Sequence, residues 1–224
     1  MDSVATTLFY LQAESLIIVY TSLGLTRSEA SLSLIPVGIG CLLGFLPRFY
    51  DSHKLNRLRE QGKPLHPEDK LFGFSLGSPI LAVALWWFAW TIPPLVHTHW
   101  VVSMLALIPA GFALNDITFT LQGYLADSYT IYAASAFAGG LLARSLLIAV
   151  ILPFTRRMYT DISANAATSI LAGVGTLFCI SPYILVRHGM EIRKRSPFAQ
   201  YSLDTYTQNQ VEDDMNTAGV ILET

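Results

Sequence analysis

The sequence predicts an all-α integral membrane protein with six transmembrane helices. Three observations support this fold class: six long apolar stretches, a charged content of only 13% against 52% hydrophobic residues, and basic residues gathered between or after the stretches. Each stretch is close to the roughly 20 residues that a helix needs to cross the hydrocarbon layer. The apolar runs are continuous, which excludes a β-barrel, whose strands alternate apolar and polar residues.

The six predicted spans follow one another closely, with one longer loop after the second. They are Val4–Leu23, Ala30–Leu46, Leu71–Pro94, Trp100–Leu121, Thr130–Pro153 and Ile162–Val186. The longer loop covers residues 48–70, and residues 201–224 form an acidic tail that we expect to be disordered. The transmembrane domain is therefore expected to comprise residues 1–200.

Local signals support the boundaries of the first four spans. No basic leader or small-residue cleavage site precedes the first span, so we expect it to be retained in the mature chain. The second span follows Thr26-Arg-Ser-Glu29, which has the form of a helix capping box. Trp90 near the end of the third span and Trp100 at the start of the fourth are typical of membrane-interface anchors.

Small residues and prolines characterise the interiors of several spans. Glycines in the second span and the run Ala133–Gly140 in the fifth would allow close approach of helix backbones. A proline removes one backbone hydrogen bond, so neighbouring helices or polar groups must cover the freed carbonyls in the membrane. The prolines concerned are Pro36, Pro79, Pro109 and Pro182.

The distribution of basic residues predicts the orientation. Ten of the fourteen Lys and Arg residues lie in residues 48–70 or directly after the sixth span. Because cytoplasmic segments carry an excess of bases, both segments and both termini are expected in the cytoplasm. We expect a multi-pass protein of the plasma membrane. The ten residues are Arg48, Lys54, Arg57, Arg59, Lys63, Lys70, Arg187, Arg193, Lys194 and Arg195.

Ionisable residues within the spans are the candidate functional residues. Glu14 lies midway along the first span and shares a helix face with Tyr10. Asp116 lies in the fourth span with Asn115 beside it, and Arg144 lies on the small-residue side of the fifth. Such groups are costly against lipid, so they should face a cavity or the bundle interior.

Two interpretations of these residues stay open. In the functional one, Glu14 or Asp116 binds a proton or a cationic substrate, and Arg144 supplies the counter-charge. In the structural one, Arg144 and a carboxylate form an ion pair that only supports packing, or backbone carbonyls at a helix end hold Arg144. Trp86 and Trp87 could line an aromatic cavity for cationic amphiphiles through cation–π contacts.

Other classes of site have little support. The segment Gly73-Phe-Ser75-Leu-Gly77 matches a serine-hydrolase elbow, but it lies in a predicted membrane helix without a histidine placed to activate the serine. Cys41 and Cys179 fall within apolar spans, as buried thiols do, rather than in a metal or disulfide pattern. The sequence predicts no enzyme activity, metal, cofactor or nucleic-acid partner.

Several short motifs carry a resemblance to a known family. They are Pro67-Glu68-Asp69-Lys70-Leu71, Trp90-Thr91, Tyr124-Leu125-Ala126-Asp127-Ser128-Tyr129, Ala133-Ala134-Ser135-Ala136, Arg144-Ser145, Met158-Tyr159 and Ser196-Pro197-Phe198-Ala199. In this order the chain resembles fungal drug:proton antiporters of the major facilitator superfamily, the multidrug and polyamine exporters. The resemblance covers residues 4–199. Glu14 resembles the acidic residue of the seventh span in this group.

The resemblance implies that the chain is the carboxy-terminal half, spans seven to twelve, of a twelve-helix carrier. Such carriers place the substrate site between two six-helix halves. The expected partners are membrane lipid, protons, a small-molecule substrate such as a cationic amphiphile or polyamine, and a missing amino-terminal half or a second copy. The alternative is an orphan six-helix module that binds a partner or has no function.

Overall fold

The computed structural model describes residues 1–22, 24, 26–47, 71–92, 99–129, 132–194 and 200. All regular secondary structure in these ranges is helical, which confirms the predicted all-α class. The loop 48–70 and the tail 201–224 lie outside the described residues. The helices are α1 (Asp2–Ser22), α2 (Arg27–Ser31), α3 (Leu34–Leu43), α5 (Phe72–Thr91), α6 (Trp100–Leu105), α7 (Leu107–Tyr129), α8 (Ala133–Asp161), α9 (Ala164–Phe178) and α10 (Ile180–Lys194).

Five helical segments of the described chain are long and apolar enough to cross a membrane: α1, α5, α6 with α7, α8, and α9 with α10. The second predicted span corresponds to a shorter apolar segment, Ser28–Leu43. The number of crossings therefore stays a prediction. The helices α7 and α8 also run on to Tyr129 and Asp161, beyond the predicted span ends. Backbone hydrogen bonding continues there although the sequence has become more polar.

Three of the predicted spans are divided into two helices, and a proline accounts for each division. Pro36, Pro109 and Pro182 each lie in the first turn of the helix that follows the break, in α3, α7 and α10. The missing N–H is tolerated there, because first-turn amides have no partner within the helix. The freed carbonyl of Phe178 accepts a hydrogen bond from Ser181 Oγ at 2.7 Å. At Pro182, a polar side chain thus covers the freed carbonyl, as expected from the sequence.

The capping box at the start of α2 is present as predicted. The hydroxyl Oγ1 of Thr26 accepts a hydrogen bond from the backbone N–H of Glu29. In return, Glu29 Oε2 accepts hydrogen bonds from Thr26 N at 2.8 Å and from Thr26 Oγ1 at 2.9 Å. This exchange satisfies amides that the first turn of a helix leaves without partners.

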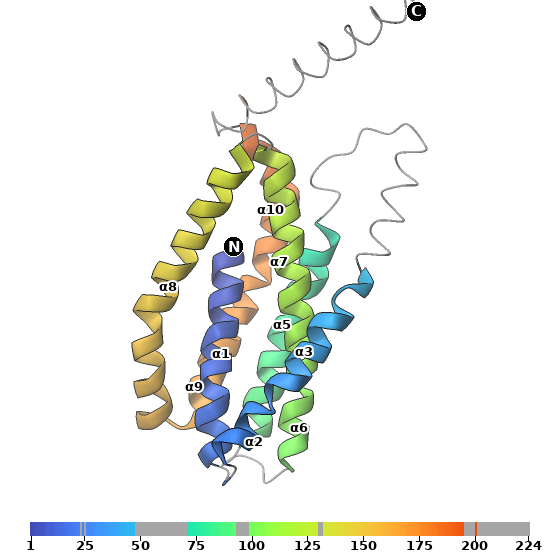
Figure 1. Ribbon diagram of the computed structural model, residues 1–224. Helices are drawn as coiled ribbons and strands as arrows, with labels where there is room; N and C mark the ends of the chain where they lie inside the picture. Colours follow the sequence, from blue (N-terminus) through green and yellow to red (C-terminus); the bar gives the residue numbers. More distant parts are fainter. Residues whose placement is uncertain are drawn as a thin grey trace, which may run out of the picture.

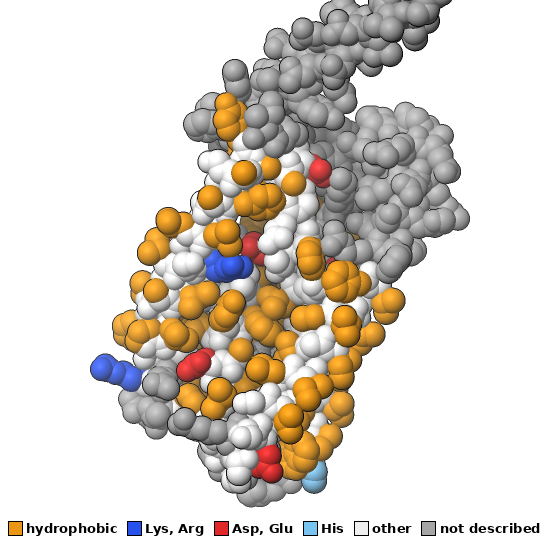
Figure 2. Space-filling view, viewed as in Figure 1, with side chains coloured by type: hydrophobic (Ala, Val, Ile, Leu, Met, Phe, Trp, Pro, Cys, Tyr) orange, Lys and Arg blue, Asp and Glu red, His pale blue; other side chains and the backbone are white. Residues whose placement is uncertain are grey.

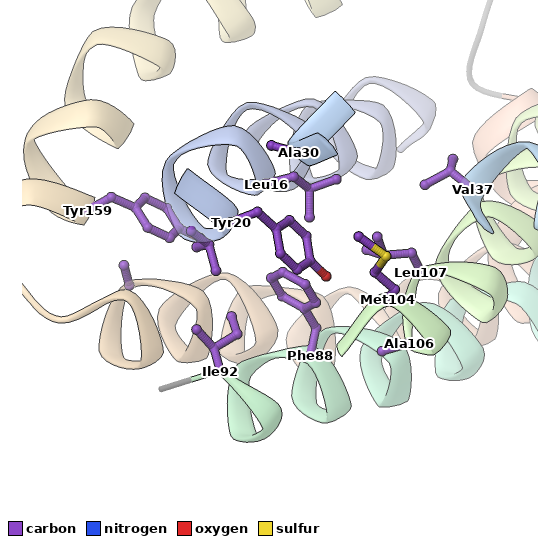
Figure 3. Packing of buried hydrophobic residues seen from close by; sticks show 12 residues of the cluster. Leu16, Tyr20, Ala30, Val37, Phe88, Ile92, Met104, Ala106, Leu107 and Tyr159 are labelled. Atoms are coloured by element: carbon purple, nitrogen blue, oxygen red, sulfur yellow. The ribbon is translucent and has the colours of Figure 1, made fainter. Parts of the chain in front are cut away.

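The helices form an elongated bundle with α1 near its middle (Figure 1). The helix α1 contacts α7, α8 and α9, while α5 packs between α7 and α9, and α3 packs along α7. Three buried clusters fill the described bundle, the smallest made of Leu8, Leu11 and Leu171; the other two are larger. In one, Tyr20 of α1 and Phe88 of α5 point toward each other, with Met104 of α6 beside them (Figure 3). In the other, the rings of Phe74 and Phe178 meet edge to face at 5.8 Å.

Glycines bring α3 and α7 into backbone contact. A Cβ atom added at Gly40 would overlap the carbonyl oxygen of Ile108, and one at Gly111 would overlap that of Val37. The glycines of the fifth predicted span make no such close contact. A Cβ atom at Gly139 or Gly140 of α8 would meet no atom within 4 Å. Among the described residues, these two glycines of α8 therefore do not mark a close-packing surface.

The helix α8 is the least covered element of the bundle. It is the most apolar of the five membrane-length segments, yet its most apolar 18-residue stretch contains no buried residue. Large apolar side chains also lie exposed along α3, including Ile35 and Leu42. Figure 2 shows the face over α1, α3 and α8: apolar side chains cover most of it, with basic and acidic groups close together near its middle.

Candidate functional site

The structure places Tyr10, and Glu14 beside it, on a side of α1 that the described residues cover only in part. Glu14 is half-buried, whereas Tyr10 is 50% exposed and Ile17, one turn further on, is 43% exposed. Residues three or four apart lie on one helix face, so these three side chains share a surface. An acidic group in a membrane-length helix thus lies at the edge of an open face rather than inside the described bundle.

Asp116 and Asn115 instead lie at contacts between helices. Asp116 is 2% exposed and lies against α5, where a Cβ atom added at Gly73 would come within 2.6 Å of its Oδ1. Asn115 Nδ2 donates a hydrogen bond to the carbonyl of Cys41 at 3.0 Å, next to the α3–α7 seam. The two residues, adjacent in sequence, therefore contact different neighbouring helices. Both residues lie at contacts between helices, whereas Glu14 lies at an open face.

Arg144 has an acidic neighbour that sequence reasoning missed. The carboxylate of Asp2, in the first turn of α1, interacts electrostatically with Arg144, and the hydroxyl of Thr6 donates a hydrogen bond to the backbone carbonyl of Asp2 at 2.8 Å. Ser3 Oγ donates to the carbonyl of Gly140 at 3.3 Å, which fixes the same turn of α1 beside α8. The juxtaposition joins helices that are far apart in the chain. No periodicity or local motif could have shown it.

The hydrogen bond of Ser3 with Gly140 is one polar tie between helices. A second polar tie joins α1, α8 and α9 near the other end of α8. The hydroxyl of Tyr159 lies 2.9 Å from Thr168 Oγ1 and also forms a hydrogen bond with Ser15. Tyr159 is 6% exposed and Thr168 is fully buried. Tyr159 belongs to the Met158-Tyr159 motif, so the structure gives a packing reason for this tyrosine.

An open apolar cavity of about 290 Å³ lies between the two ties, where α1, α8 and α9 meet. Its polar lining side chains are Thr7 and Thr155, whose hydroxyls donate to the carbonyls of Ser3 and Ile151. The cavity therefore contains no hydroxyl donor that needs a ligand. The residues that line it are Val4, Thr7, Leu8, Leu11, Leu147, Ile151, Phe154, Thr155, Met158, Ile170, Leu171 and Val174.

The two tryptophans predicted to line an aromatic cavity lie elsewhere. Trp86 Nε1 donates a hydrogen bond to Thr176 Oγ1 of α9 at 3.0 Å, and its ring meets that of Trp90 edge to face at 5.8 Å. Trp87 is 43% exposed on α5. Neither residue borders the cavity between α1, α8 and α9.

The remaining motif residues lie near the ends of α7 and α8. Tyr124, Asp127 and Tyr129 are half-buried in the last two turns of α7, and Ser135 is exposed in the first turn of α8. Pro67 and Glu68 fall outside the described residues. In the part of the chain that the structure describes, no three His, Cys, Asp or Glu side chains come together in a way that could hold a metal ion.

Buried polar groups also include one that the sequence did not single out. Gln12 of α1 is 2% exposed, and neither atom of its carboxamide has a hydrogen-bond partner among the described residues. It lies close in sequence to Leu8 and Leu11, which border the cavity. The sequence pattern could not identify Gln12, because a single polar residue does not alter the hydropathy of a span and creates no periodicity.

The chain is similar to fungal transporters. It is 33% identical over 185 residues to the uncharacterized transporter mfs2 of Schizosaccharomyces pombe, which covers 82% of this chain and 34% of the relative. Efflux pump FUB11 of Gibberella moniliformis is 32% identical over 177 residues, covering 79% of this chain and 30% of the pump. The MFS-type efflux pump MFS2 of Trichophyton rubrum is 38% identical over 133 residues, covering 59% of this chain and 22% of the pump.

The chain spans about a third of the length of the first two of these relatives. No protein-family model and no solved structure matches it. The relatives include proteins named as efflux pumps and as major facilitator superfamily multidrug transporters. These similarities agree with the resemblance seen in the motifs, and they extend over about four fifths of the chain.

Proposed function

The chain is a homologue of part of fungal major facilitator superfamily efflux pumps, and from this we propose that it is one six-helix half of such a pump. In this proposal the half corresponds to spans seven to twelve. It comprises residues 1–200, and the tail 201–224 follows it. Transport requires a complementary half, supplied by a longer protein, by a partner chain or by a second copy.

The observation that carries this proposal is the uncovered face of α1 and α8. Ionisable residues are costly against lipid, and Glu14 and Arg144 both lie in membrane-length helices. Glu14 borders a face on which Tyr10 and Ile17 are exposed, and the apolar centre of α8 is unburied. A second bundle placed over this face would remove the ionisable groups from lipid and enclose a pathway between the halves.

Within that pathway we assign Glu14 to the binding of a proton or of the cationic group of a substrate. Its half-buried position at the open face supports this role. Arg144 supplies the counter-charge, and Asp2 is its electrostatic neighbour in this chain. The substrate is a small amphipathic molecule such as an organic cation or polyamine. Asp116 and Asn115 would act through the packing of α7 against α5 and α3.

The orientation in the proposal follows from the basic residues. Both termini and the loop 48–70 face the cytoplasm. Ten of the fourteen bases lie in this loop or directly after the sixth predicted span, and an even number of spans places the amino terminus on the same side. Direct export from the cell then requires the plasma membrane.

The experiment that tests the function is complementation by halves. The chain is expressed in cells that lack their own drug pumps, alone and together with the remaining half of a homologous efflux pump, and retention of a fluorescent organic cation is measured. We expect export only when both halves are present. Absence of export when both halves co-purify from the membrane would contradict the proposal and favour a non-transporting module.

A matched pair of variants tests the role of Glu14 in the same assay. Glu14→Gln should abolish proton-coupled export while leaving the amount of membrane-inserted protein unchanged. Thr21→Val, on the same helix near its end, is the control and should export normally. Unchanged export by Glu14→Gln over a range of pH values would remove Glu14 from the mechanism.

A further inference from the structure

We propose that the cavity between α1, α8 and α9 holds one hydrocarbon chain of a membrane phospholipid. The inference does not depend on transport. It requires only that the three helices lie in a bilayer. Each belongs to a segment long and apolar enough to do so.

The chemistry of the lining favours an alkyl chain. Its ten other side chains are Val, Leu, Ile, Phe and Met, and its two threonines have hydroxyls that already donate to backbone carbonyls. A polar head group would therefore find no hydrogen-bond donor in the cavity, whereas a hydrocarbon chain needs none. The polar ties at either end, Ser3 with Gly140 and Tyr159 with Thr168, limit the cavity along the helix axes.

The dimensions also fit one chain better than a protein partner. Along α8 the lining runs from Leu147 to Met158, roughly 16 Å at 1.5 Å per residue. That length is about half of the roughly 30 Å hydrocarbon layer, the depth of one leaflet. Spread over roughly 16 Å, a volume of about 290 Å³ leaves a cavity narrower than a helix of a second copy, which is about 10–12 Å wide with its side chains.

Most of the cavity lining on α1 lies on a different side of that helix from Tyr10 and Glu14. Three of the four α1 lining residues, Val4, Leu8 and Leu11, lie about 100° around the helix from Tyr10 and Glu14 at 3.6 residues per turn, whereas Thr7 lies two turns from Glu14 on nearly the same side. Several lining side chains stay open to the surroundings: Phe154 is 67% exposed and Ile170 is 52% exposed. The cavity is therefore accessible to lipid in the chain alone.

The test is photo-crosslinking of the full chain in nanodiscs that contain a phospholipid with a diazirine on one acyl chain. Labelled residues are identified by mass spectrometry. We expect labelling to concentrate on Phe154, Ile170 and Val174. Ile151→Trp fills the cavity and should lower this labelling by about tenfold, which corresponds to about 1.4 kcal/mol of lost affinity. Val150→Trp adds the same side chain at the neighbouring exposed position of α8 and should leave the labelling unchanged.

Four outcomes would overturn the proposal. They are equal labelling of all exposed apolar faces, equal labelling in Ile151→Trp and Val150→Trp, displacement of the probe by a sterol but not by unlabelled phospholipid, and crosslinking of two chains through the cavity. Val174→Trp fills the cavity from α9 and provides a second variant should Ile151→Trp fail to fold. Circular dichroism establishes folding for each variant. Because no step requires export, failure here is distinct from failure of the complementation assay.

Discussion

The helices α5 and α8 are both long and apolar, yet they occupy opposite environments. Over the most apolar 18-residue stretch of each, 56% of α5 is buried inside the described chain and none of α8 is, although α8 is the more apolar helix. Hydropathy therefore identifies which segments enter a membrane, but it does not identify what each face meets there. The difference indicates that α5 belongs to the core of the described bundle and α8 to its boundary.

The largest expected effect contrasts two phenylalanines. Phe88 of α5 is fully buried, whereas Phe154 of α8 is 67% exposed. Phe88→Ala removes a ring from the core and should lower the free energy of unfolding by about 3–5 kcal/mol. Denaturant titration of the purified chain in detergent measures this change. Phe154→Ala should change it by less than about 0.5 kcal/mol. Equal losses would mean that α8 is packed as tightly as α5.

Two glycines sharpen the comparison at the level of the backbone. Gly40→Val should destabilise the chain by about 1–3 kcal/mol, because its Cβ would overlap the Ile108 carbonyl oxygen in the α3–α7 contact. Gly139→Val meets open space on α8 and should have little effect in the chain alone. Thermal unfolding in detergent compares the two. A destabilised Gly139→Val variant would show that this part of α8 is covered after all.

A hydroxyl deletion tests the tie that holds α8 to the core. Tyr159→Phe loses the hydrogen bonds with Thr168 and Ser15 and should cost about 1 kcal/mol. Tyr10→Phe removes a hydroxyl from a side chain that is 50% exposed and serves as the control. The same unfolding assay applies. No difference between the two variants would mean that α8 is held to α1 and α9 by apolar contacts alone.

The smallest expected effect lies outside the spans, at the capping box. Hydrogen bonds from the backbone and the hydroxyl of Thr26 lower the pKa of Glu29 below its ordinary value of 4.5. The stabilisation is therefore complete above pH 4.5 and is lost as the pH falls through the lowered value. Unfolding of the wild type should depend slightly on pH in this acidic window, and Glu29→Gln should remove that dependence. An identical pH profile for both proteins would contradict the assignment.

The sequence predicted what depends on local pattern. The all-α class, the capping box at Thr26 and Glu29, and the resemblance to fungal efflux pumps are confirmed. Long-range contacts were not predictable: Asp2 is the neighbour of Arg144, and Trp86 bonds to Thr176 rather than lining the cavity. The prolines were visible, but the division of three spans by Pro36, Pro109 and Pro182 was not predicted. The roles of Glu14 and Arg144 stay predictions.

The most direct test of the half-bundle account is labelling of α8 from the lipid phase with an apolar diazirine, in the chain alone and in complex with a complementary half. We predict that Leu142, which is 66% exposed, is labelled in the chain alone and protected in the co-purified complex. Val83 of α5, which is 64% exposed, should be labelled equally in both. Unchanged labelling of Leu142 in the complex would contradict the claim that a second bundle covers α8.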